Sequence, residues 1–160
     1  MEIDAVVYWE EELNRQERKK RQGKKEMKTA LQEPTTRVDE LAYQVIGAAI
    51  EVHRILGPGF LESVYEEALA IEFDLRGIPY ERQKPMVLEF KGKPVGDSRL
   101  DFLVGGELVV ELKAVEAIHP IYPAKVIHYL KMSGLQLGLI INFHVVLLKD
   151  GIKRIALTHN

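Results

Sequence analysis

The chain has 160 residues, of which 46% are apolar and 29% are charged, and its formal net charge is -2. This composition is ordinary for a globular domain with a core of its own. The absence of cysteine excludes disulfides, thiolate metal sites and cysteine nucleophiles. No apolar run approaches the roughly 18 residues that a membrane span needs, and the N-terminus has no apolar segment of the signal-peptide type. We therefore expect a cytoplasmic protein with no membrane partner.

Charge divides the chain near residue 36. Residues 1–14 carry five acidic side chains and no basic one, whereas residues 15–28 carry eight Lys or Arg against two Glu. We interpret residues 1–36 as a charged extension, helical or disordered, and residues 37–160 as one domain. The extension could instead be a basic arm that follows phosphates, or reflect a start codon placed too far upstream. The domain itself is not basic overall, so it would bind nucleic acid through a local patch or a metal.

Two helices are predicted at the start of the domain. Apolar residues recur at spacings of three and four over 41–56, with Asp39 as the expected N-cap and Gly57-Pro58-Gly59 as the stop. A second apolar stripe runs over 61–73 and ends at Gly77. His53 lies among apolar residues of the first helix, and we interpret it as structural.

The pattern then changes to short apolar segments separated by turn residues. The expected strands are 78–83, 86–90, 99–104, 108–113 and 137–142, followed by a closing hairpin of 145–148 and 152–156. A helix is expected over 124–134. This order of elements predicts an α/β fold with a central mixed sheet flanked by helices.

The most informative charged residues lie on two of these strands. Asp101 lies on one strand, and Glu111 and Lys113 lie two residues apart on the next, so they share a face. A three-residue turn at 105–107 would place Asp101 opposite Glu111, whereas a two-residue turn would place the two acids on opposite faces. We predict the three-residue turn, because only then do the three charged side chains converge.

Two adjacent carboxylates repel each other unless a cation lies between them, and ligands that are all oxygen favour Mg²⁺ or Mn²⁺. Such a metal would polarise a phosphoryl oxygen and lower the pKa of a bound water. Lys113 would orient that water or stabilise the developing negative charge. The residues alone leave an alternative open, a solvated Asp101 and a surface pair of Glu111 and Lys113, since the D…ExK spacing is short and common.

A longer pattern surrounds these residues. The segment 59–65, GFLESVY, fits G-x-x-E-x-x-Y, and it is followed by RLDF at 99–102 and VELKA at 110–114. With these motifs, and with IGAAIEVH at 46–53 and LKDGIKR at 148–154, the chain resembles the GxxExxY proteins, a family of the PD-(D/E)XK nuclease superfamily. The likeness extends from about Val38 to Leu157. It implies a restriction-endonuclease-like core, Mg²⁺ or Mn²⁺ as cofactor, a nucleic-acid substrate with DNA favoured, and a homodimer.

The resemblance also assigns roles to individual residues. Asp101, Glu111 and the backbone carbonyl of Leu112 would bind the metal, and Lys113 would be the catalytic lysine. Glu62 would complete the site from its helix, directly or through water.

Related nucleases often carry a Gln-x-x-x-Tyr helix after the lysine. Here Tyr129 is kept, but Lys125 stands where glutamine is usual. Lys125 could bind a phosphate, or it could compete with the metal by pairing with a carboxylate. We interpret Tyr65 and Tyr129 as packing residues whose hydroxyls reach the edge of the site.

We therefore expect a Mg²⁺-dependent nuclease that hydrolyses phosphodiester bonds, with DNA as the favoured substrate. A second hypothesis is a non-catalytic module that holds nucleic acid or a protein partner on a nuclease fold. A third is an accessory protein in which the acidic cluster serves stability alone. The complete set of Glu62, Asp101, Glu111 and Lys113 favours the enzyme, whereas Lys125 is the departure from the pattern.

Overall fold

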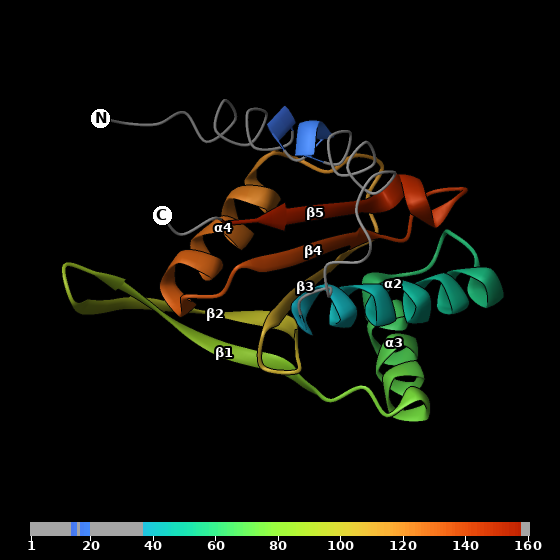
Figure 1. The fold of residues 1–160 in the computed structure, drawn as a ribbon, viewed down its shortest axis with the longest axis horizontal. Coiled ribbons are helices and arrows are strands. Elements are labelled where there is room, and N and C mark those ends of the chain that lie inside the picture. The colour runs from blue at the N-terminus through green and yellow to red at the C-terminus, as the bar shows by residue number, and fades with distance from the viewer. Residues whose placement is uncertain (1–13, 16, 20–36, 158–160) are drawn as a thin grey trace, which may run out of the picture.

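The computed structural model describes residues 14, 15, 17–19 and 37–157. The predicted N-terminal extension therefore lies outside the described residues, except for the few exposed helical positions between 14 and 19. Within the described domain, no helix is both long enough and apolar enough to cross a membrane. The elements in chain order are α2 (Arg37–Leu56), α3 (Glu62–Arg76), β1 (Tyr80–Phe90), β2 (Lys93–Val104), β3 (Leu108–Lys113), α4 (Ile121–Ser133), β4 (Leu137–Asn142), the 3₁₀ turn η1 (Leu148–Gly151) and β5 (Ile152–Ala156) (Figure 1).

The five strands form one sheet in the order β1-β2-β3-β4-β5. All neighbours are antiparallel except β3 and β4, which are parallel. A parallel pair needs a crossover connection, and α4 supplies it here. The predicted mixed sheet with flanking helices is thereby confirmed.

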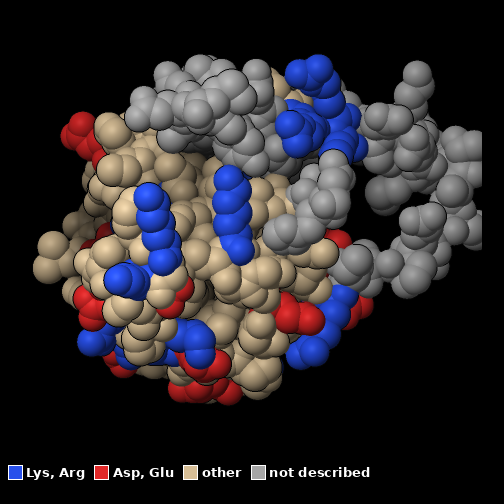
Figure 2. Space-filling view, turned by 90° about the vertical axis from the view of Figure 1, so that its left-hand side faces the viewer, with Lys and Arg blue, Asp and Glu red and all other residues tan. Residues whose placement is uncertain are grey.

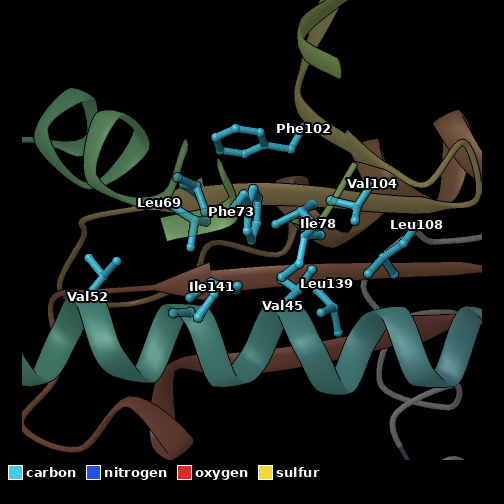
Figure 3. Packing of buried hydrophobic residues seen from close by; sticks show 14 of the residues in the cluster. Val45, Val52, Leu69, Phe73, Ile78, Phe102, Val104, Leu108, Leu139 and Ile141 are labelled. Carbon is cyan, nitrogen blue, oxygen red and sulfur yellow. The ribbon is translucent and has the colours of Figure 1, made fainter. Parts of the chain in front are cut away.

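The sheet separates two apolar cores. Helices α2 and α3 pack with one face, through residues such as Val45, Phe73 and Leu139 (Figure 3). Helix α4 packs with the other face, against residues that include Val109 and Ile140. All six residues of β4 are buried, as the continuous apolar run at 137–142 predicts for a strand covered on both faces.

The β1–β2 hairpin is longer than the sequence analysis predicts. The expected strands 78–83 and 86–90 form one strand, β1, and the expected strand 99–104 is the end of β2, which begins at Lys93. Pro85 does not interrupt β1, because β1 is an edge strand and a proline at an edge need not donate to a neighbour.

Two other expectations are wrong. Residues 145–148 form no strand, and β5 pairs with β4 in place of the expected closing hairpin. The segment is held against α2 instead, where the Nε2 atom of His53 lies 2.8 Å from the carbonyl oxygen of Val145. Asp39 is not an N-cap, because α2 begins at Arg37 and Asp39 lies inside its first turn, bonded to Arg154 of β5.

Candidate active site

The turn between β2 and β3 fixes the positions of the two central acids. Val104 pairs with Leu108, and the glycines of the turn 105–107 have φ values of 58° and 71°. The three-residue turn predicted from the sequence is therefore confirmed. Continuing the register along the two strands places Asp101 opposite Glu111.

At these acids the two strands separate. The last regular pair is Phe102 with Val110. Beyond it, the backbone N–H of Asp101 donates to Oε1 of Glu111 at 3.3 Å, and the backbone N–H of Leu112 donates to Oδ2 of Asp101 at 2.8 Å. We call this point, where β2 and β3 separate beyond Phe102 and Val110, the fork. Here side-chain oxygens replace main-chain oxygens as hydrogen-bond acceptors, so both carboxylates lie against the backbone of the opposite strand.

Burial and mutual repulsion make both acids hard to ionise. Glu111 is 4% exposed, and its burial, followed by the charge of Asp101, raises its pKa to about 8. Burial also raises the pKa of Asp101, against the opposing effect of the hydrogen bond from Leu112. Two such carboxyls cannot both be charged cheaply without a cation beside them.

Glu62 reaches this pair from the first turn of α3. Its side chain is half-buried, and burial raises its pKa. The positive charge of Lys113 acts in the opposite direction on that pKa, and the negative charge of Asp101 acts with burial. The structure therefore brings Glu62 within electrostatic range of Asp101 and of Lys113.

Tyr65 fixes the loop that leads into α3. Its hydroxyl donates to the carbonyl of Gly57 at 2.6 Å and accepts the N–H of Phe60 at 3.2 Å, while its ring stacks on Phe143 with centroids 4.4 Å apart. The hydroxyl of Tyr65 is thus engaged in the loop before α3. Tyr65 thereby secures the turn that precedes Glu62, the first residue of the helix.

The two lysines lie on the α4 side of the acids. The Nζ atom of Lys113 is 4.2 Å from the ring centroid of Tyr122. Burial lowers the pKa of Lys125, but a hydrogen bond with Tyr129 and the negative charges of Glu111 and Asp101 raise it overall.

Tyr129 connects α4 with β2. Its ring is buried, and its hydroxyl bonds to the hydroxyl of Ser98 as well as to Lys125. Tyr129 is therefore a packing residue whose hydroxyl connects Ser98 with Lys125.

Gln83 and Glu66 also lie beside the acids, and neither was predicted from the sequence. The side-chain amide of Gln83 donates to Oε1 of Glu66 at 2.9 Å and to Oδ1 of Asp101 at 3.4 Å. Arg82 also pairs with Glu66, at 2.8 Å. Glu66 could have been found from the sequence, because it follows Glu62 by four residues and so lies on the same helix face.

The donor set at the fork fits a hard divalent cation. Asp101 and Glu111 offer carboxylate oxygens, which Mg²⁺ and Mn²⁺ prefer. The carbonyl of Lys113 accepts the N–H of Phe143 beside β4, so the backbone groups of Leu112 point the other way, toward Asp101. Within residues 37–157 no three acidic or histidine side chains form a ready-made cluster, so a cation here would rest on two carboxylates and a carbonyl.

One side of the described domain carries mixed charge. Figure 2 shows the side of the molecule to which the β1–β2 turn and α4 are directed, and basic and acidic side chains are interspersed there. No broad positive field is visible on this face of the described domain.

Comparison with known proteins gives one match. The family model described as the PD-(D/E)XK nuclease superfamily matches residues 39–155. Searches of curated proteins and of solved structures found no match. The matched region covers most of the chain and contains the whole sheet apart from the final residue of β5. The chain therefore belongs to the PD-(D/E)XK nuclease superfamily.

Proposed function

We propose that this protein is a nuclease of the GxxExxY type that uses Mg²⁺ or Mn²⁺ to hydrolyse phosphodiester bonds, with DNA as the preferred substrate. The observation that carries the proposal is the pair of facing acids at the fork, the half-buried Asp101 and the buried Glu111, with their raised pKa values. Two carboxylates that are withdrawn from water beside each other repel, and a bound cation would offset both the repulsion and the lost solvation. The superfamily membership supports the same chemistry.

The metal would be held by Asp101, Glu111 and the carbonyl of Leu112, with Glu62 taking part through a water. When bound, the ion would polarise a phosphoryl oxygen and lower the pKa of the attacking water. Glu62, from the first turn of α3, would orient that water by accepting a hydrogen bond from it.

The lysines would handle the negative charge of the substrate. Lys113 shares a strand face with Glu111, and its contact with Tyr122 restricts the ammonium to one region. From there it would stabilise the charge that develops on the phosphoryl oxygens. Lys125, which is exposed at the edge of the site, would bind a neighbouring phosphate.

A second function is favoured by one observation. The positive charge of Lys125 already favours the ionised form of Glu111 and interacts, more weakly, with Asp101. Such a lysine could take part of the role of a metal, and the fold would then bind nucleic acid or a protein without cutting. The two functions differ in whether Mn²⁺ is bound and whether phosphodiester bonds are broken.

Cleavage assays distinguish these functions. Single-stranded, duplex and branched DNA and RNA would each be incubated with the protein and Mn²⁺, beside Lys113→Ala and the distant exposed control Lys149→Ala. We expect metal-dependent cleavage, faster on DNA than on RNA, that Lys113→Ala reduces at least about 100-fold and Lys149→Ala leaves unchanged. Cleavage that survives Lys113→Ala would indicate a contaminant, and binding without cleavage would establish the second function.

Light scattering of the same samples tests the expected homodimer.

A further inference from the structure

The backbone of Gln83 has an unusual conformation beside the acids. Two non-glycine residues in the described part of the chain have positive φ, Gln83 at 51° and Lys91 at 50°. Lys91 lies in the turn between β1 and β2, where such a conformation is common. Gln83 lies within a strand, and the register of its neighbours, Arg82 with Phe102 and Lys84 with Leu100, places it opposite Asp101.

Side chains of the hairpin change faces at this position. Leu100 packs in the α4 core and Phe102 in the core of α2 and α3, although residues two apart on a regular strand share a face. The partner strand behaves in the same way, since Tyr80 packs with α2 and α3 and Met86 with α4. The left-handed residue therefore coincides with a local rotation of both strands.

The amide of Gln83 connects two carboxylates. Its NH₂ group has two hydrogens, and its nitrogen lies 2.9 Å from Oε1 of Glu66 and 3.4 Å from Oδ1 of Asp101. The other oxygen of Asp101, Oδ2, accepts the N–H of Leu112. The carboxylate of Asp101 is thus oriented on both sides, and the amide lies between it and the negative charge of Glu66.

We propose that Gln83 is a positioning residue for the metal-binding carboxylate of Asp101. The inference rests on the proposed function. The left-handed backbone of Gln83 directs its side-chain amide to the fork. The amide holds Asp101 in the orientation that a cation requires, and it connects Asp101 to α3 through Glu66. A left-handed backbone is unfavourable for a residue with a Cβ and costs nothing comparable for glycine. Gln83 therefore contributes to the site through its side chain and not to the stability of the strand.

Three substitutions distinguish the effect of the Gln83 side chain from the effect of its backbone conformation. Gln83→Gly suits the left-handed conformation but removes the amide. Gln83→Asn keeps an amide on a residue type that tolerates the conformation. Lys91→Gly relieves the same kind of backbone strain at the far end of the hairpin and serves as the matched control.

The readouts are the Mn²⁺ dissociation constant, from calorimetry, and the melting temperature of the metal-free protein. We expect Gln83→Gly to weaken Mn²⁺ binding by about 10- to 100-fold, the range found for residues that orient metal ligands. Its metal-free melting temperature should equal or exceed that of the wild type. Gln83→Asn should recover part of the affinity, and Lys91→Gly should bind Mn²⁺ like the wild type.

Two results overturn the inference alone. One is wild-type Mn²⁺ affinity in Gln83→Gly. The other is a weaker affinity accompanied by a lower metal-free melting temperature, which would show that Gln83 acts on the fold. If the wild type itself binds no Mn²⁺, the proposed function fails together with the inference, and that outcome is distinct from the other two.

Discussion

The backbone N–H of Leu112 donates a 2.8 Å hydrogen bond to Oδ2 of Asp101 across the point where β2 and β3 separate. Without this bond the fork would leave an amide in a largely buried position without its ladder partner, which costs free energy. The same bond fixes one oxygen of the carboxylate. Asp101 therefore has a structural role, as the acceptor for Leu112, and a proposed chemical role, as a metal ligand. Different substitutions of Asp101 can separate the two roles.

Asp101→Asn and Asp101→Ala should differ in stability. The asparagine carbonyl can still accept the N–H of Leu112, whereas alanine leaves that group without its acceptor. We expect Asp101→Ala to lose about 1–3 kcal/mol of unfolding free energy relative to Asp101→Asn, the usual cost of an unsatisfied buried donor. Urea unfolding of the metal-free proteins measures the difference. Equal stability of the two variants would mean that the bond to Leu112 contributes little.

The stability of the metal-free protein should fall as the pH rises toward 8. The pKa of Glu111 is raised from 4.5 to about 8 in the folded protein, chiefly by burial. Between these values the folded protein keeps a proton that the unfolded chain has lost, so each increase in pH favours unfolding. The stabilising effect of this proton is complete below about pH 4.5 and is lost by about pH 8.

Glu111→Gln tests this pH dependence. The variant cannot ionise, so we expect it to be more stable than the wild type at pH 8 and similar to it at pH 4.5 in urea unfolding without metal. Mn²⁺ should bind the wild type more tightly as the pH rises, because the metal requires the deprotonated acid. The same pH dependence of stability in both proteins would show that Glu111 is not the group responsible.

Lys125→Gln should strengthen metal binding. The charge of Lys125 interacts favourably with Glu111 and Asp101, so the lysine competes with a cation for the same acids. Because Lys125 is exposed, we expect Mn²⁺ affinity to rise only on the order of twofold to fivefold. Calorimetry measures the change, with Lys131→Gln on the same helix as control. A lower affinity in Lys125→Gln would show that the lysine supports the site.

Gly105→Ala should destabilise the protein more than Gly106→Ala. Both glycines have positive φ, so either alanine would adopt an unfavourable conformation at a cost of roughly 1–2 kcal/mol. A Cβ at position 105 would also lie 2.7 Å from Cδ1 of the buried Leu41, whereas a Cβ at position 106 meets no atom within 4 Å. Overpacking adds about 1–3 kcal/mol. Thermal unfolding of the two variants checks the order, and equal losses would contradict it.

Some of the site could be predicted because its requirements are local. The bounds of β3 follow from an apolar segment that begins after the turn glycines, and those of β4 from a nearly continuous apolar run, and both strands occupy the residues expected of them. The turn at 105–107 followed from one geometric condition, that Asp101 and Glu111 share a face, and the register meets that condition. Patterns of this kind depend on few residues and on the fixed period of a strand.

Other features depend on tertiary contacts that no local pattern records. Nothing in the residues around Gln83 indicates a left-handed strand residue, because the rotation serves packing on both sides of the sheet. Tyr65 stands at a spacing that the sequence shows, but its partners, Gly57 and Phe60, appear only when the loop is folded. The pairing of β5 with β4 was missed for a similar reason, since a hairpin and a more distant partner fit the same apolar pattern.

The proposed metal site is tested most directly by a calorimetric titration of the metal-free protein with Mn²⁺ at pH 8, beside Asp101→Asn. We expect saturable binding to the wild type and its loss in Asp101→Asn, while the metal-free melting temperatures of the two proteins remain close. Equal binding to both proteins, or no binding to the wild type, would contradict the claim that Asp101 and Glu111 hold a catalytic metal.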